Sequence, residues 1–170
     1  MQLAQIENIT ADNARLVSNL HANLGGLYRM NGYPDLAREH MEKSISLLDQ
    51  FNLLHINDSI PQIANYAMFL TEQQEPERGI SELQKLSGII KEYHSDECLD
   101  YAKVQENLAT IYLMTANLSQ AKTHFKKAFK IYEKIWADEP EMIEAKYREI
   151  QELYPQIGFS IGKTLSGLLT

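Results

Sequence analysis

The amino-acid sequence predicts an all-α protein built as a solenoid of antiparallel helix pairs. The composition is the first reason: hydrophobic residues make up 44% of the chain, charged residues 23%, and its 170 residues include only 8 Gly and 5 Pro. Such a composition is typical of a folded chain with few turns. The second reason is an internal repeat of 42 residues, and the third is the position of the prolines between the repeated segments.

The repeat is clearest in three six-residue segments that start with Asn and contain apolar residues at matching places. These segments, 42 residues apart, are Asn23–Tyr28, Asn65–Leu70 and Asn107–Tyr112. A small residue and, four positions later, a large apolar residue follow each segment at a constant distance, as Ala37/Met41, Gly79/Leu83 and Ala121/Phe125. Two clusters with the same period indicate stacked two-helix units, none of which buries its apolar face alone.

Proline marks the expected starts of three helices, because its fixed φ suits the first helical position and it has no N–H to leave unpaired there. Pro34 and Pro76 precede second helices of a repeat, and Pro140 precedes a later first helix. No strand pattern competes with this interpretation. We therefore expect helices over residues 11–30, 34–54, 60–74, 76–93, 97–115, 118–136 and 139–154.

The combined spacing Leu-Gly/Ala-x-x-Tyr and Ala-x-x-x-Phe resembles the tetratricopeptide repeat signature, in which small residues let two antiparallel helices approach. The first and third units match it well, and the second matches in size and polarity. HEAT and armadillo repeats have periods of roughly 40 to 47 residues, but these spacings favour the tetratricopeptide repeat. The resemblance implies a right-handed superhelical solenoid.

The sequence departs from that signature in three respects. Its closing Pro is missing, its period is 42 rather than about 34 residues, and the usual Trp position holds His21, Ile63 and Gln105. Lengthened repeats of this kind are similar to those of the kinesin light chain and its bacterial relatives.

The period also predicts how the chain is divided. Leu3 and Ile6 fall 42 residues before Ile45 and Leu48, so residues 1–17 are expected to hold the tail of a preceding helix and the start of the first repeat helix. This pattern suggests a piece cut from a longer array. The expected units that follow are repeat one at 18–59, repeat two at 60–101, repeat three at 102–143, and a degenerate fourth repeat or C-terminal capping helix at 144–170.

Charge and hydropathy argue against several functional classes. The net charge is −7, so no general excess of positive charge favours nucleic-acid binding. A cluster of lysines is expected to be a solvated helix face; it comprises Lys122, Lys126, Lys127 and Lys130. The single Cys98 cannot form an internal disulfide. No apolar run reaches the ~20 residues that span a bilayer, and the N-terminus lacks a signal-peptide pattern, so we expect a cytoplasmic protein that does not bind membranes.

The sequence shows no pattern that predicts an enzyme, a cofactor or a metal site. Gly158–Gly162 matches the G-x-S-x-G motif of hydrolases, but that motif requires a preceding strand and a later acid and His, which the sequence does not supply. The five histidines include no i,i+4 pair and no H-E-x-x-H. We therefore expect a non-enzymatic protein without cofactor or metal.

The most suggestive polar feature is the Asn that recurs in each first helix, as Asn23, Asn65 and Asn107. Asn is a mediocre residue inside helices, so three occurrences at one position call for a shared cause. The resemblance implies that first helices line a concave groove where such an amide contacts the backbone of an extended peptide, donating and accepting at once. The alternative is that each Asn bonds a neighbouring helix and fixes the repeat geometry.

Helical spacing predicts the other residues of this surface. Asn19, Met30, Met68 and Lys103 share a face with the recurring Asn, while Arg29 and Arg148 lie close to it as candidates for acidic groups of a ligand.

The expected function is therefore a protein interaction module that binds a peptide or a segment of a partner protein. Two alternatives stay open. One is a peptide-sensing regulatory domain of a larger signalling or transcription-regulating protein. The other is a scaffold that self-associates into a homo-oligomer through an exposed terminal face.

Overall fold

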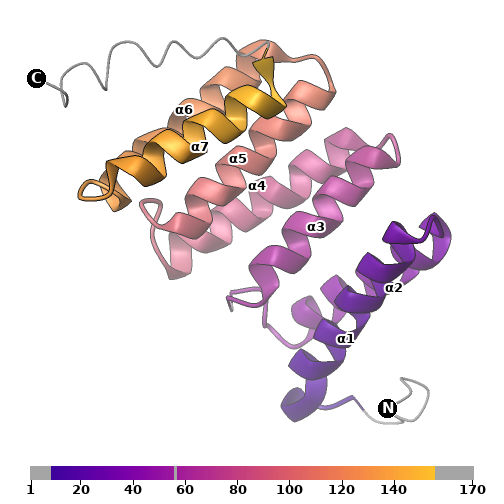
Figure 1. Cartoon of the computed structure of the whole chain (residues 1–170). Coiled ribbons are helices and arrows are strands. Elements are labelled where there is room, and N and C mark those ends of the chain that lie inside the picture. Colours follow the sequence, from indigo (N-terminus) through magenta and orange to yellow (C-terminus); the bar gives the residue numbers. More distant parts are fainter. Residues whose placement is uncertain (1–8, 56, 156–170) are drawn as a thin grey trace, which may run out of the picture. The chain divides into compact units, whose positions relative to one another are not determined.

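The computed structural model describes residues 9–55 and 57–155, and these fold into α-helices without a strand (Figure 1). The helices are α1 (Ala11–Met30), α2 (Pro34–Gln50), α3 (Ser59–Glu72), α4 (Pro76–Tyr93), α5 (Leu99–Met114), α6 (Leu118–Ile135) and α7 (Pro140–Leu153). The predicted all-α class is confirmed. The expectations for residues 1–8, for the motif at 158–162 and for a capping helix beyond residue 155 lie outside the described residues.

The helices pair in the order of the sequence. The chain forms two compact units, residues 1–96 and residues 97–170. In the first unit α1 packs on α2 and α3 packs on α4, while α2 and α3 connect the two pairs. In the second unit α5 packs on α6, and α7 packs on α6. Within each unit, consecutive helices run antiparallel, as helix pairs of a repeat require.

The turn inside each helix pair repeats with the 42-residue period. The first helices end at Met30, Glu72 and Met114, and the residue two positions beyond each end has a positive φ, namely Gly32 (77°), Gln74 (64°) and Ala116 (58°). In each turn the following N–H bonds a carbonyl five residues back, as Tyr33 does to Tyr28. This is the Schellman arrangement, which satisfies carbonyls at a helix end.

The second helix of the first pair ends earlier than expected, at Gln50 rather than residue 54. Asn52 takes a positive φ of 54°, and the Leu53 N–H donates to the Leu48 carbonyl at 2.7 Å. Asn tolerates the left-handed region better than other side chains. The apolar residues beyond it continued the helical pattern in the sequence and hid this stop signal.

Small residues set the distance between the helices of a pair. Gly25 of α1 is buried, and a Cβ there would lie 2.6 Å from Met41 Cγ and 3.2 Å from the Ala37 carbonyl oxygen of α2. Gly79 of α4 lies equally close to α3, because a Cβ there would be 2.6 Å from the Ala67 carbonyl oxygen. These positions belong to the repeated pattern of small residues, which therefore has a steric cause.

Each unit has its own hydrophobic core. In the first unit, Ala37 and Met41 of α2 pack against α3, where Tyr66, Phe69 and Leu70 are at most 5% exposed. In the second unit, α6 supplies the centre of the core.

In that second core, Phe125, Phe129 and Tyr132 of α6 cluster with Ile150 of α7. Glu106 of α5 connects all three helices of the unit. It accepts a hydrogen bond from Tyr132 Oη at 2.7 Å and pairs with Lys146 Nζ of α7 at 2.9 Å.

The adjacent glycines of α1 predict opposite effects of one added methyl group. Gly25→Ala should lower the free energy of unfolding by about 1–3 kcal/mol, because the Cβ clashes with α2. Gly26→Ala should raise it by about 0.5–1 kcal/mol, because nothing lies within 4 Å of that Cβ and Ala favours the helix. Urea denaturation of both variants measures this difference, and equal effects would contradict the steric role of Gly25.

The repeated turn yields a second prediction. Ala116 occupies the turn position that Gly32 occupies in the first pair, and an Ala in the left-handed region costs roughly 1–2 kcal/mol. We expect Ala116→Gly to raise the free energy of unfolding by up to about 1 kcal/mol. The same change at Ala102, which is buried inside helix α5, should destabilise instead. Urea denaturation of the two variants checks both signs.

Candidate peptide-binding groove

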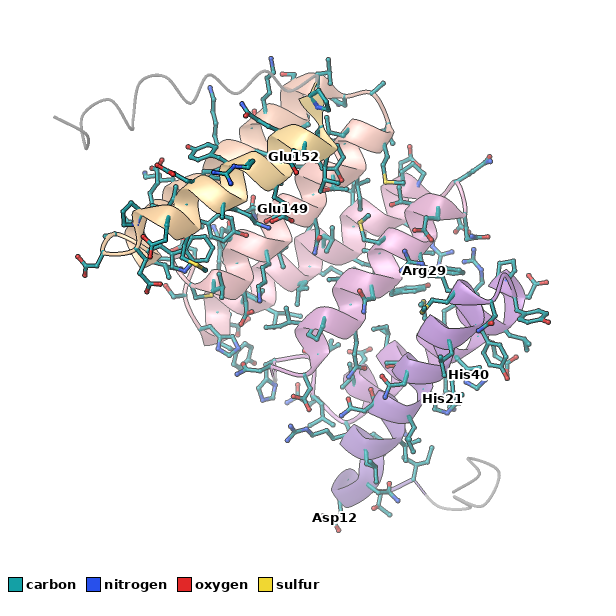
Figure 2. The ribbon with its side chains drawn as sticks, viewed as in Figure 1. Asp12, His21, Arg29, His40, Glu149 and Glu152 are labelled. Atoms are coloured by element: carbon teal, nitrogen blue, oxygen red, sulfur yellow. The ribbon has the colours of Figure 1, made fainter. Side chains whose placement is uncertain are left out.

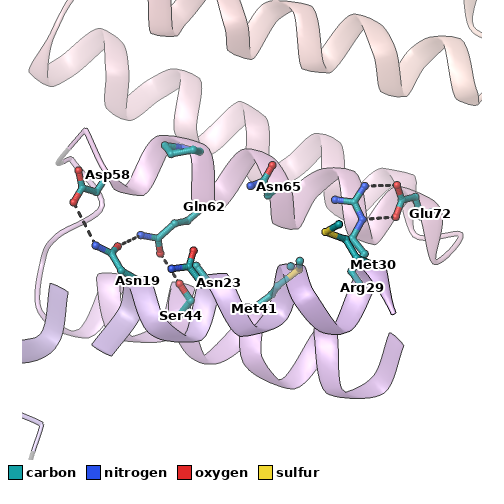
Figure 3. A pocket seen from close by; sticks show the side chains of 13 residues that line it. Asn19, Asn23, Arg29, Met30, Met41, Ser44, Asp58, Gln62, Asn65 and Glu72 are labelled. Carbon is teal, nitrogen blue, oxygen red and sulfur yellow. Dashed lines mark hydrogen bonds and ion pairs between the residues drawn. The ribbon is translucent and has the colours of Figure 1, made fainter. Parts of the chain in front are cut away.

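A pocket of about 780 Å³ lies between α1 and α3 in the first unit (Figure 3). Helix α2 and the loop before α3 complete its walls. Its lining consists mainly of small, amide and Met side chains, with charged groups at its two ends: Asn19, Ala22, Asn23, Gly26, Arg29, Met30, Met41, Ser44, Asp58, Pro61, Gln62, Asn65 and Glu72.

A network of hydrogen bonds closes one end of the pocket and is centred on Gln62 of α3. Its Nε2 donates to Asn19 Oδ1 at 2.5 Å, and its Oε1 accepts from Ser18 and Ser44 at 2.8 and 2.5 Å. Ser18 and Ser44 are buried on α1 and α2. The amide of Gln62 therefore joins three helices, and this end of the pocket is internally satisfied.

The carboxylate of Asp58 extends the same network toward solvent. Arg15 Nε donates to it at 2.7 Å and Asn19 Nδ2 at 3.5 Å. The hydrogen bond from Arg15 holds the pKa of Asp58 below its usual range. Asp58 is thus an anion at neutral pH whose charge is matched by an arginine next to it.

At the opposite end of the pocket, an ion pair connects the two sides of the groove. Arg29 of α1 donates through Nε and Nη2 to the two carboxylate oxygens of Glu72 on α3, at 2.8 and 2.5 Å. The two-point geometry matches the planar guanidinium to the carboxylate. Both side chains are about one-third exposed, so the pair lies at the rim and contributes little to stability.

The middle of the pocket contains amides that no neighbour engages. Asn23 of α1 and Asn65 of α3 are both exposed, and their side chains make no hydrogen bond within residues 9–55 and 57–155. Gly26 lies one helical turn from Asn23, and a Cβ there would meet nothing within 4 Å. The groove centre therefore offers unpaired donors and acceptors beside open space.

The structure brings together five of the nine residues predicted for binding. Asn19, Asn23, Arg29, Met30 and Asn65 all line the pocket. Of these, Asn19 and Arg29 already have partners, and Met30 is 85% exposed at the rim.

The other four predicted residues are not part of this lining. Met68 is half-buried on α3. Lys103 and Asn107 of α5 and Arg148 of α7 belong to the second unit, where Lys103 and Arg148 are exposed and Asn107 is half-buried. No hydrogen bond or ion pair joins these three to one another in the described part of the chain, and their role in binding stays a prediction.

Sequence reasoning missed the polar network of the groove. Gln62 shares no repeat position with another Gln, since the equivalent residues are Leu20 and Val104. Ser44 and Met41 reach the pocket from α2, which the helical face of the Asn could not reveal. Asp58 comes from the loop before α3. Only the crossing of three helices brings these side chains together.

Other kinds of site find no support in the described residues. No group of three or more His, Cys, Asp or Glu within residues 9–55 and 57–155 is arranged to hold a metal ion. No helix in that part of the chain is both long and apolar enough to cross a membrane.

Comparison with known proteins identifies the fold. Residues 59–134 match the family model of the tetratricopeptide repeat, so this part of the chain is similar to tetratricopeptide repeat proteins. Domains of that family are generally protein–protein interaction modules, and no catalytic family matches. The predicted resemblance to that family and the solenoid of helix pairs are confirmed.

One solved structure illustrates the similarity. The crystal structure of BtubC (BKLC) from P. vanneervenii superposes with a TM-score of 0.67 at 18% identity, covering 77% of this chain and 50% of that one. The chain thus spans half the length of that relative, and the likeness concerns the fold. No curated protein matches the sequence.

The unpaired amides of the groove and the bonded amide of Gln62 should contribute differently to the stability of the protein. Asn23→Ala and Asn65→Ala should change the free energy of unfolding by less than about 0.5 kcal/mol, because both side chains are exposed and unpaired. Gln62→Ala should lower it by about 1–2 kcal/mol, because the substitution removes the amide that bonds Ser18, Ser44 and Asn19. Urea denaturation distinguishes the cases, and a large loss in the Asn variants would indicate a structural role instead.

Proposed function

We propose that the groove between α1 and α3 binds an extended peptide segment of a partner protein. The observation that carries the proposal is the pair Asn23 and Asn65, which two successive first helices present to one pocket without a partner in the described chain. An unpaired amide in a groove is suited to a peptide backbone, because it can donate to a carbonyl and accept from an N–H.

The alternative role for the recurring Asn is to fix the repeat geometry. In this unit, other residues make the hydrogen bonds that such a role requires. The bonds that connect α1, α2 and α3 at the groove run through Gln62 and Asn19. Because those residues already hold the helices together, the amides of Asn23 and Asn65 are available for a ligand.

The open space at Gly26 accommodates a side chain of the bound peptide. The equivalent positions of the later repeats hold Met68 and Thr110, which would occupy that space. Ala22, one turn before Gly26, and Met30, one turn after it, also line the pocket. Flexible Met side chains adapt to varied apolar partners, so we propose that an apolar side chain of the ligand lies here.

The charged groups are proposed to act at the ends of the ligand. Arg29 is engaged by Glu72, so it contacts an acidic group only by exchanging one carboxylate for another. Lys103 and Arg148 belong to the second unit and have no such partner in the described residues. We propose them separately as contacts for acidic groups of a ligand at that unit.

Selection from a displayed library of random 12-residue peptides tests the groove. We expect the double variant Asn23→Ala/Asn65→Ala to bind the selected peptides at least ~10-fold more weakly, because two or more hydrogen bonds of about 1 kcal/mol each are lost. Gly26→Met should weaken binding as well by filling the groove, whereas the helix stays intact. Fluorescence anisotropy with synthetic peptides measures both effects.

Gln84→Ala is the matched control, because Gln84 is an exposed amide on α4 outside the pocket lining. Its affinity for the peptides should equal that of the natural chain. Peptides that bind the double Asn variant as tightly as the natural chain would refute the groove as the binding site.

A further inference from the structure

A pair of histidines connects α1 to α2 next to the groove. His21 Nδ1 lies 2.8 Å from His40 Nδ1, and the two ring centroids are 5.0 Å apart (Figure 2). The ring of His40 also stacks on Tyr28, with centroids 5.3 Å apart and planes 16° apart. Both histidines are half-buried.

The third repeat contains the same arrangement with one substitution. His124 occupies the place of His40, stacks on Tyr112 at 5.3 Å, and lies 2.9 Å from Gln105 Oε1 through its Nδ1. Gln105 occupies the place of His21. In the second repeat the corresponding residue is Ile63, which is buried. The position therefore holds the helix pair together by a polar contact in two repeats, and only the first repeat uses two titratable rings.

We propose that His21 and His40 form an acid-sensitive latch, which holds α1 against α2 at neutral pH and releases when both rings are protonated. This inference goes beyond peptide binding, because it concerns the stability of the helix pair that carries the groove.

The protons of the pair determine when the latch opens. At neutral pH one ring donates its Nδ1–H to the unprotonated Nδ1 of the other. A first added proton goes to the free Nε2 of the donor ring, and the hydrogen bond survives. A second proton must go to the accepting Nδ1 itself. The bond is then lost, and two positive charges face each other across 2.8 Å.

The surroundings favour the uncharged form. Burial lowers the pKa of His21 below its ordinary value of 6.5, and the charges of His40 and Lys43 lower it further, while Glu39 opposes them. Lys43 and Glu39 both lie on α2, the helix across the contact. Folding thus holds His21 neutral at a pH where an unfolded chain already binds a proton. The stabilisation is complete above pH 6.5 and is lost as the pH falls through the lowered pKa.

The Gln105–His124 pair lacks this sensitivity to a second proton. Burial also lowers the pKa of His124, but a protonated His124 still donates its Nδ1–H to the carbonyl oxygen of Gln105. No second charge develops there. A Gln at position 21 would therefore reproduce in the first repeat the pair that the third repeat contains.

The latch is connected to the groove through the neighbouring residues. His21 directly precedes Ala22 and Asn23, and His40 directly precedes Met41, all of which line the pocket. Met41 also contacts α1 at Gly25. Separation of α1 from α2 at this level therefore displaces one wall of the groove.

Thermal unfolding at pH 7.5 and 5.5, with EDTA present to exclude metal effects, tests the latch. We expect His21→Gln, which copies the pair of the third repeat, to reduce the fall in melting temperature by about 2–4 °C relative to the natural chain. Gln105→His installs a second histidine pair and should enlarge the fall by a similar amount. His55 and His94, which lie outside the two pairs, are unchanged in all three chains.

Imidazole NMR of the natural chain provides a second readout at single residues. We expect the His21 ring to take up its proton below its ordinary pKa of 6.5, because burial and the neighbouring charges of His40 and Lys43 oppose the charged form. Equal falls in melting temperature for the three chains, or protonation of His21 at its ordinary pKa, would overturn the proposal. If His21→Gln fails to fold, Gln105→His decides the question alone.

Discussion

The close approach of paired helices at small residues is the constraint on which the structure of this protein depends. At Gly25 the backbone of α1 lies so near α2 that a single Cβ would reach within 2.6 Å of Met41. Packed interiors tolerate such overlap poorly. Because this contact aligns α1 with α2, it also determines which face of α1 remains for the groove.

Two adjacent glycines show how one helix presents one face to its partner helix and another face to the groove. Gly25 faces α2, where its lack of a Cβ permits the close contact. Gly26 lines the pocket, and a Cβ there would meet nothing within 4 Å. The same division applies to the polar residues. Gln62, Ser18 and Ser44 satisfy one another and bind three helices together, while Asn23 and Asn65 stay unpaired between the two ends of the groove. The chain thus separates the groups that hold the groove from those available to a ligand.

The contact between the helices of a pair also varies from one repeat to the next. The position of the usual Trp holds an apolar Ile63 in the second repeat and polar residues in the first and third. In the first repeat this contact is a half-buried pair of histidines, and the strength of the contact depends on pH. Repeats with a common backbone can in this way differ in their response to solution conditions.

The sequence by itself determined the resemblance to tetratricopeptide repeats and the helix pairs, because small residues, prolines and core positions recur every 42 residues and act locally. It also predicted Asn23 and Asn65 as neighbours on one surface, since helical spacing defines a face. It did not reveal the stop at Asn52, the ion pair of Arg29 with Glu72, or the network around Gln62. The stop at Asn52 is local, and the apolar residues beyond it concealed it in the sequence. The ion pair and the network depend on how helices cross, because residues 18 to 44 positions apart meet only after packing has brought their helices together.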